Sequence, residues 1–161
     1  MNNSTKGKIY FSLSNQTSKH ELCPFNPKCP PEIIQPLLLL YPSELQEAFR
    51  FILINHTNPE FSVTQIPEKF DGSLRTWERL FHEKVGCTLE SCLAQVRLCH
   101  YLVREIEYGP LAIKKEFDKV GFGSRNSCNY ERNKYLTSHN ASFLALLSYF
   151  KIPLSSSVVR E

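Results

Sequence analysis

The segment DGSLRTWERLFHEKVG, residues 71–86, carries the pattern that decides the fold of this chain. Its large apolar residues recur at three- and four-residue spacings, which place them on one face of a helix. These residues are Leu74, Trp77, Leu80 and Phe81. Asp71-Gly72 supplies a tight turn before the segment, and Gly86 supplies a helix end after it. The pattern predicts an amphipathic helix that begins near Ser73 and has these four apolar side chains as its buried face.

The opposite face of this predicted helix is polar and carries Arg75, Thr76, Glu78 and Arg79. Two arginines one turn apart, on a helix that follows a tight turn and another short helix, are typical of a helix-turn-helix, whose second helix reaches bases in the major groove of DNA. The alternative interpretation is an ordinary solvated face, because charge is common on helix surfaces. The order of the neighbouring segments favours the first interpretation.

The composition is that of a globular protein, with 161 residues, 42% hydrophobic and 22% charged residues. No apolar run approaches the roughly 18 residues that a membrane-spanning helix needs. The polar start of the chain lacks the apolar stretch of a secretory signal, so the default expectation is a cytoplasmic location without a membrane partner. The net charge of +3 is compatible with a nucleic-acid partner but does not identify one.

The six cysteines are expected to be reduced thiols, because the chain has no secretory signal and no C-x-x-C pair. Cys92 and Cys99 are seven residues apart, on one helix face among apolar residues, which predicts core packing over metal binding. Cys23 and Cys29 lie in a predicted loop beside Lys28, where exposure would permit redox chemistry. Their role is left open.

An enzyme is not expected, because the residues that chemistry requires do not occur in recognisable patterns. The chain has no glycine-rich phosphate loop and no H-E-x-x-H motif. His82 and His100 stand as single histidines on predicted helices. The sequence therefore predicts no catalytic residues, no metal site and no cofactor.

From residue 42 onward, the residues that start and end helices recur regularly and predict a helical region. Residues 1–41 are expected to form a mostly irregular extension with a short strand over residues 8–13. Ser43 with Gln46, and Ser62 with Gln65, match the capping box that starts a helix. The first helix, about residues 44–55, is expected to bury Leu45, Ala48, Phe49, Ile52 and Leu53. A second helix around residues 63–70 is expected to be shortened by Pro67, which is tolerated only in a first turn.

A long helix is predicted over about residues 89–107, capped by Thr88 and stopped by Gly109-Pro110. Its apolar stripe keeps the helical period and consists of Leu89, Cys92, Leu93, Val96, Cys99, Val103 and Ile106. At 1.5 Å per residue such a helix spans about 27 Å. Major-groove entries on one face of B-DNA are ~34 Å apart, so a rod of this length could space two recognition helices.

The helix-turn-helix outline then repeats. Ile113, Phe117 and Val120 mark a short helix, and residues 121–124 make a turn and cap into a helix over about residues 125–136. A last helix is expected over about residues 141–150, followed by a frayed tail over residues 154–161. The predicted fold is therefore all-α, with about seven helices in two helix-turn-helix units joined by a long central helix.

Over about residues 45–144 the chain resembles the DNA-binding domain of the AraC/XylS family of bacterial transcription regulators. The residues that carry the resemblance are Ile66, Ser73, Arg79-Leu80-Phe81, Gly86, Arg97-Leu98, Gly121-Phe122 and Ser124. The family fold has seven helices in two helix-turn-helix units. The resemblance implies a DNA-binding domain over residues 42–153, with a first unit at about 44–88, a linker helix at about 89–107 and a second unit at about 111–150.

The resemblance also implies the residues that face DNA. They are Arg75, Thr76, Glu78 and Arg79 in the first unit, and Arg125, Asn126, Asn129 and Tyr130 in the second. Arginine pairs with guanine and asparagine with adenine in the major groove, and the helix starts at Ser73 and Ser124 would contact phosphates. The partners expected are double-stranded DNA and RNA polymerase, for a transcription regulator such as an activator. About 42 preceding residues are too few for a sensing domain, so no small-molecule effector is expected.

The second unit departs from the family pattern. Cys128 and Arg132 stand where the family usually has phenylalanines, and Thr137 and Asn140 where it has glycine and proline. An arginine at a core-facing position must find a partner or extend to solvent. The departures support an alternative function, namely a protein-interaction module or anti-activator that keeps the fold and has lost DNA binding.

Overall fold

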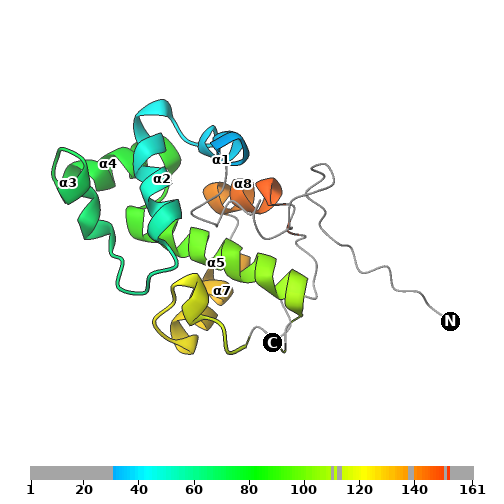
Figure 1. Cartoon of the computed structure of the whole chain (residues 1–161). Coiled ribbons are helices and arrows are strands. Elements are labelled where there is room, and N and C mark those ends of the chain that lie inside the picture. Colours follow the sequence, from blue (N-terminus) through cyan, green and yellow to red (C-terminus); the bar gives the residue numbers. More distant parts are fainter. Residues whose placement is uncertain (1–30, 110, 112–113, 138–139, 151, 153–161) are drawn as a thin grey trace.

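The computed structural model describes residues 31–109, 111, 114–137, 140–150 and 152, and within these every regular element is helical (Figure 1). Seven α-helices are present there, which confirms the all-α expectation. The elements are α1 (Pro31–Leu38), η1 (Ser43–Leu45), α2 (Gln46–Asn55), η2 (Val63–Gln65), α3 (Ile66–Lys69), α4 (Leu74–Val85), α5 (Leu89–Tyr108), η3 (Asp118–Val120), α7 (Arg125–Thr137) and α8 (Ala141–Tyr149).

The long helix α5 is the element against which α2, α4, α7 and α8 all pack. In Figure 1, α2, α3 and α4 gather near its N-terminal end and α7 lies beneath it. Its cap is as predicted, because the Thr88 hydroxyl accepts the Ser91 N–H at 3.1 Å. Its twenty residues span about 30 Å. Every residue of the predicted apolar stripe is buried except Ile106, which is half-buried.

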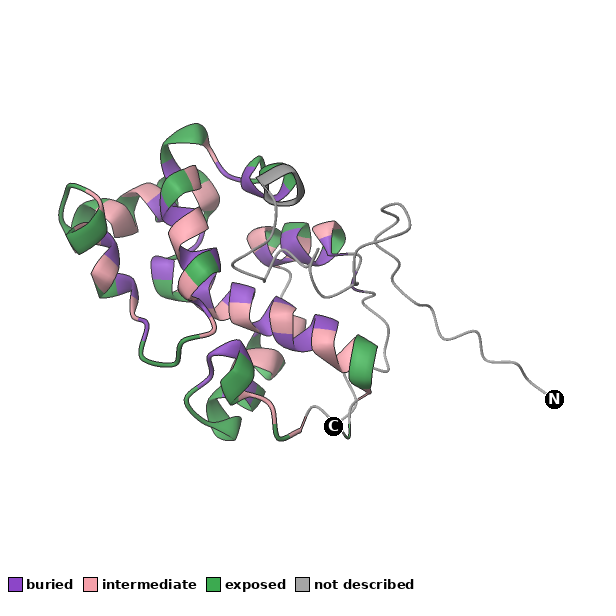
Figure 2. Ribbon diagram, in the orientation of Figure 1, coloured by how far each residue is buried: buried purple, intermediate pink, exposed green. Residues whose placement is uncertain are grey.

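Burial on α5 extends beyond that stripe. Gln95, Leu98, Tyr101 and Leu102 are also buried, so neighbours cover more than one face of the helix (Figure 2). A helix buried on several faces cannot shift without exposing apolar area to water, at about 25 cal/mol for each Å². α5 is therefore a rigid mount for the elements on both sides of it.

In the first unit, all five residues predicted for the first helix are buried, four of them on α2 and Leu45 at the end of η1. Pro67 lies in the first turn of α3, which has four residues, so the predicted shortening is confirmed. Ser62 accepts the Thr64 N–H and caps η2. The prediction for Ser43 was wrong, because Ser43 lies inside the 3₁₀ turn η1 and α2 begins only at Gln46.

Helix α4 begins and ends as the sequence predicts. The Ser73 hydroxyl accepts the Thr76 N–H at 3.2 Å. Gly86 has φ +81°, and its N–H donates to the carbonyls of Phe81 and His82. Phe81 is fully buried, but Leu74, Trp77 and Leu80 are only half-buried. The expected four-residue core face is thus one buried residue with three at its rim, since α4 lies at the edge of the molecule.

Trp77 has a local structural role. Its ring lies 5.9 Å from that of Phe70, between centroids, and its Nε1–H donates to the Asp71 carbonyl at 3.2 Å. Trp77 therefore fastens the turn between α3 and α4.

The extension expected over residues 1–41 is not irregular throughout, because residues 31–38 form α1. Leu37, Leu38 and Tyr41 are buried, and the Tyr41 ring stacks on Phe49 with centroids 3.7 Å apart. The prolines concealed this helix in the sequence. Pro31 is its first residue, where proline is tolerated, but Pro36 lies inside the helix. The expected strand over residues 8–13, Cys23, Cys29, Ile113 and the tail over residues 154–161 lie outside the described residues.

In the second unit, Val120 and Phe122 are buried before α7, and Asn140 caps α8 by accepting the Phe143 N–H at 3.1 Å. The partner expected for Arg132 is present. Its two terminal nitrogens bind the two carboxylate oxygens of Glu105 on α5, at 3.2 and 3.3 Å. This bidentate pair joins α7 to α5.

The two units meet at Arg97 on α5. Its guanidinium donates to the carbonyls of His56 at 2.8 Å, Asn58 at 2.9 Å and Phe61 at 3.3 Å, all in the loop after α2. Gly121, at the turn of the second unit, has φ +95°, and a Cβ there would lie 1.8 Å from the His56 carbonyl oxygen. The loop of one unit, the central helix and the turn of the other thus touch at one point.

We predict that Gly121→Ala destabilises the protein by roughly 3 kcal/mol or more, because it combines a left-handed backbone conformation with a backbone clash. Gly123→Ala is the matched control, since nothing lies within 4 Å of a Cβ at that position. Urea unfolding followed by Trp77 fluorescence measures both. Equal midpoints for the two variants would contradict the packing described at Gly121.

Candidate nucleic-acid interface

The two units present the same local construction, a turn followed by a serine-capped helix. Gly72, with φ +118°, precedes Ser73 and α4. In the second unit the Ser124 hydroxyl accepts the Ser127 N–H at 3.1 Å at the start of α7. Both helix starts are exposed. Each therefore presents N–H groups and a positive dipole end toward solvent, which favours an anion such as a phosphate.

Three of the four residues predicted to face DNA from α4 are exposed, namely Arg75, Thr76 and Arg79. The Arg79 guanidinium pairs with both oxygens of Glu83 at 3.2 Å, yet 59% of its side-chain area remains accessible. An exposed pair one helical turn apart contributes about 0.3–0.5 kcal/mol. Arg79 can therefore exchange this partner at small cost.

The fourth residue, Glu78, faces the protein. It is half-buried, and its Oε2 accepts the Leu89 N–H at 3.3 Å. The carboxylate thus satisfies the first turn of α5 and fastens α4 to it, which is also favourable for the helix dipole. Glu78 is therefore not part of the candidate interface.

All four residues predicted on α7 are exposed, and these are Arg125, Asn126, Asn129 and Tyr130. Tyr130 is accessible over 64% of its area. The opposite face of α7 carries Cys128 and Tyr135, which are buried. Figure 2 shows exposed residues on the outer turns of this helix. α7 is therefore packed on α5, with its polar face outward.

Sequence reasoning missed a histidine pair at the junction of the units. The Nε2 of His56 lies 2.9 Å from the Nδ1 of His100, and the Nδ1 of His56 lies 2.6 Å from the Leu53 carbonyl. A carbonyl only accepts, so His56 carries its proton on Nδ1 and its Nε2 accepts from His100. Forty-four residues separate the two, and no local spacing signals the contact.

Both imidazoles are held neutral. Burial lowers the pKa of His56 to about 4, and the charge of Arg97 adds to this effect. Burial also lowers the pKa of His100 well below its usual value, with further contributions from His56 and Arg104. The hydrogen bond between the rings requires that the Nε2 of His56 carries no proton. Two imidazolium rings would both be donors at this contact, and the bond would be lost.

The cysteines that the structure describes are Cys87, Cys92, Cys99 and Cys128, all buried and none in a disulfide. Core packing of Cys92 and Cys99 is confirmed. Burial raises the pKa of Cys128 to about 12 and that of Cys99 still further, so neither is a reactive thiolate at neutral pH. Among the described residues, no group of three or more histidine, cysteine, aspartate or glutamate side chains could hold a metal ion.

No family model matches this chain, and no curated protein or solved structure is significantly similar to it. None of the helices in the described part combines the length and apolar character needed to cross a bilayer. The candidate interface is therefore defined by exposure and helix geometry, through seven side chains. These are Arg75, Thr76, Arg79, Arg125, Asn126, Asn129 and Tyr130.

We predict that the free energy of unfolding falls as the pH decreases from 6.5 to 5. The unfolded chain takes up protons near the ordinary histidine pKa of 6.5, whereas folded His56 does so only near 4. The contribution of His56 is thus fully present above pH 6.5 and is lost toward pH 4, by about 2 kcal/mol over the window from 6.5 to 5. His100 acts in the same direction, because its pKa in the folded protein is also lowered.

Urea unfolding at pH 7, 6 and 5 measures this loss, and imidazole nitrogen shifts of His56 by NMR assign it. Glu131 contributes a free energy of unfolding that rises as the pH falls, because burial raises the pKa of its carboxyl group in the folded protein. The unfolding curves therefore sum opposite contributions, and the NMR shifts are needed to assign the loss to His56. A protonated His56 ring in the native protein at pH 5.5 would contradict the account of the pair.

Proposed function

We propose that this chain binds double-stranded DNA sequence-specifically, as a transcription regulator, with α4 and α7 in successive major grooves. The observation that carries the proposal is the repeated construction: two serine-capped helices, each with exposed polar side chains in its first turns, both packed on one long helix. A single amphipathic helix with arginines would be ordinary. Two such helices on a common mount are the arrangement that a double helix-turn-helix uses.

The dimensions support this proposal. The major groove is ~12 Å wide and admits an α-helix with its side chains. Successive major-groove entries on one face of the duplex are ~34 Å apart, and α5 spans about 30 Å. With α4 fastened to the first turn of α5 by Glu78, and α7 fastened to it by Arg132 and Glu105, one rigid body would present both helices.

The exposed side chains supply suitable chemistry. Arg75 and Arg79 can each donate two hydrogen bonds to guanine, and Asn126 and Asn129 can pair with adenine. For Arg79, a contact worth ~1–3 kcal/mol of base discrimination outweighs loss of its exposed ion pair. The N–H groups at the two helix starts would contact phosphates and set the register.

Within the same proposal, the chain is an AraC/XylS-type DNA-binding module acting in the cytoplasm, with RNA polymerase as a further partner. The resemblance in sequence motifs and the matching helix order support it. The turn at Gly121-Phe122 and the cap at Ser124 support it in particular, because a positive-φ glycine and a serine cap precede α7 as they precede α4. The glycine lies three residues before the cap in the second unit and one residue before it in the first.

We predict that Arg79→Ala weakens specific DNA binding by roughly 5- to 150-fold, corresponding to ~1–3 kcal/mol, and leaves the fold intact. Lys84→Ala is the matched control, because it removes the same charge from the C-terminal end of α4, where the lysine pairs with Glu44. Fluorescence anisotropy with a selected duplex measures both. Unchanged affinity of Arg79→Ala would show that the assigned face of α4 is wrong.

The second candidate function is a protein-interaction module or anti-activator on the same fold. The exposure of large apolar residues favours it, with Tyr130 64% and Leu111 81% accessible. Salt dependence separates the two functions. A DNA binder should lose affinity with a logarithmic slope near −0.9 for each phosphate neutralised, whereas absence of DNA binding at low salt would favour the second candidate.

A further inference from the structure

Two cysteine thiols meet at the start of α5, where the chain passes from α4 into the central helix. Cys87 lies immediately before the cap at Thr88, and Cys92 lies in the first turn of the helix. Side chains at these two positions commonly contact each other across a helix start. Here the two thiols are joined by a hydrogen bond. The folded chain thus holds two oxidisable groups in contact.

Tyr41 gives this contact a direction. Its hydroxyl oxygen lies 3.7 Å from the Cys92 sulfur. Burial raises the pKa of Tyr41 well above its usual value, so the hydroxyl keeps its proton and donates it to that sulfur. The Cys92 sulfur then accepts from Tyr41 and uses its own S–H toward Cys87. Cys87 is therefore the acceptor at the end of a short chain of hydrogen bonds.

The two thiols differ in acidity for this reason. The bond from Cys92 lowers the pKa of Cys87, and a bond from Ser142 adds to this effect, whereas burial and the Glu78 charge oppose it. The same contact, together with burial, raises the pKa of Cys92 well above its usual value. Cys87 also precedes a helix of twenty residues, whose positive dipole end favours a thiolate. Cys87 is thus the nucleophile of the pair, and Cys92 stays protonated.

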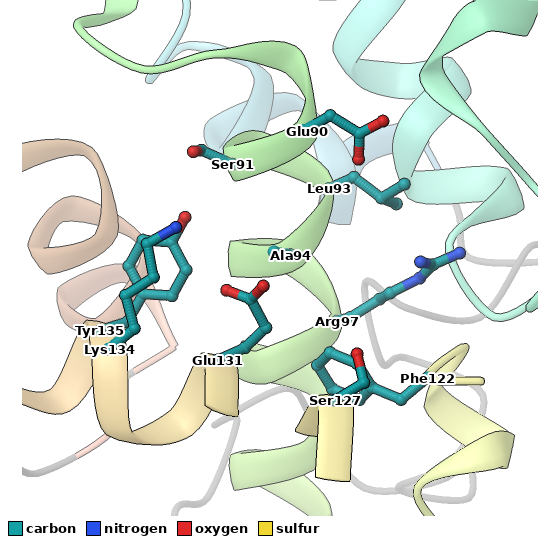
Figure 3. A pocket seen from close by; sticks show the side chains of 10 residues that line it. All are labelled: Glu90, Ser91, Leu93, Ala94, Arg97, Phe122, Ser127, Glu131, Lys134 and Tyr135. Carbon is teal, nitrogen blue, oxygen red and sulfur yellow. The ribbon is translucent and has the colours of Figure 1, made fainter. Parts of the chain in front are cut away.

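A groove of about 220 Å³ gives small molecules a route to the pair, between the segment after α1, the end of α4 and α8. Tyr41 and Ser142 line this groove, and they are the groups that contact Cys92 and Cys87. Cys87 keeps 5% of its area accessible, whereas Cys92 has none. The groove between α5 and α7 differs, because no cysteine is among the side chains that line it (Figure 3).

We propose that Cys87 and Cys92 form a reversible oxidation site, at which hydrogen peroxide converts the two thiols into a disulfide. The Cys87 thiolate attacks a peroxide oxygen, so that an S–O bond forms, the O–O bond breaks and the leaving hydroxide takes up a proton. The Cys92 sulfur then attacks the Cys87 sulfur. An S–S bond forms, the S–O bond breaks, and the hydroxyl group leaves with the Cys92 proton as water.

Two electrons pass in this sequence from the thiols to the peroxide, which becomes two molecules of water. A dithiol reductant returns the electrons by thiol–disulfide exchange and restores the pair. The disulfide would tie the connection between α4 and α5 to the first turn of α5. Glu78 of α4 accepts the Leu89 N–H in that same turn. Oxidation would therefore act where α4 is fastened to the central helix.

An effect of oxidation on DNA binding by α4 rests on the proposed function. Formation of the disulfide does not, because it is measured without DNA. Loss of DNA binding in every assay would contradict the proposed function and leave the oxidation site intact.

The test treats the reduced full chain with hydrogen peroxide at neutral pH, blocks the remaining thiols with iodoacetamide in urea and maps tryptic peptides by mass spectrometry. Cleavage after Lys84 and Arg97 releases a peptide of residues 85–97, which contains Cys87 and Cys92 and no other cysteine. We expect this peptide to lose the mass of two hydrogen atoms and to escape alkylation. Dithiothreitol added before the blocking step should restore two alkylated cysteines.

Single variants assign the two roles. In Cys92→Ala, Cys87 should stop at the sulfenic acid, which dimedone traps. In Cys87→Ala, Cys92 should take up no dimedone. Cys128→Ala is the matched control, because it removes a buried thiol outside the peptide and should form the disulfide at the wild-type rate. Circular dichroism checks that each variant keeps its helices.

The wild type decides the matter even where a variant fails to fold. In the reduced native protein, iodoacetamide should alkylate Cys87 at least tenfold faster than Cys128, since only the thiolate reacts. A peptide of residues 85–97 that stays fully alkylatable after peroxide treatment would overturn the proposal. Equal alkylation rates of Cys87 and Cys128, linkage of Cys87 to a cysteine other than Cys92, or dimedone on Cys92 in Cys87→Ala would overturn it as well.

Discussion

The contact on which the two-unit arrangement depends is the guanidinium of Arg97 against three carbonyls of the loop after α2. Carbonyls beyond a helix end have no intrahelical donor, and burying them unpaired would be costly. Arg97 satisfies them from the middle of α5, and burial of the guanidinium lowers its pKa, which opposes but does not remove its charge. Because Gly121 packs against the same carbonyl of His56, the second unit is placed by the same contact.

The faces of α4 and α7 that remain exposed to a ligand are those that do not pack on α5. α4 turns Phe81 and Glu78 toward α5, which leaves Arg75 and Arg79 outward. α7 turns Cys128, Arg132 and Tyr135 inward, which leaves Asn126 and Asn129 outward. The exposed residues at the two helix starts are thus a consequence of packing on a shared helix. This is the physical basis for treating the two starts as one interface.

Local patterns predicted much of this fold because they depend on neighbours in the chain. The α5 stripe, the caps at Ser73 and Thr88, and the end at Gly86 are all set within one or two helical turns. Proline misled the prediction at α1, since its local preference was outweighed by burial of Leu37 and Leu38.

The candidate site was less predictable, because its details arise from contacts between distant segments. The bond from Glu78 to Leu89 spans eleven residues, and the pair of His56 and His100 spans forty-four. The need for a partner to Arg132 could be predicted from its position, but the identity of Glu105 could not. Exposure of Arg75 and Arg79 follows the helical period, as predicted, but Glu78 on the same predicted face is half-buried. The α7 residues come from the resemblance, and they too are exposed.

Selection of bound sequences from a random double-stranded DNA pool tests most directly whether the two helices act as one interface. The account predicts enrichment of two short motifs at a fixed separation of about one helical turn, ~10 base pairs between centres. Enrichment of a single motif would show that only one unit contacts bases. A pool that remains random after repeated selection at low salt would contradict the assignment of these helices to DNA.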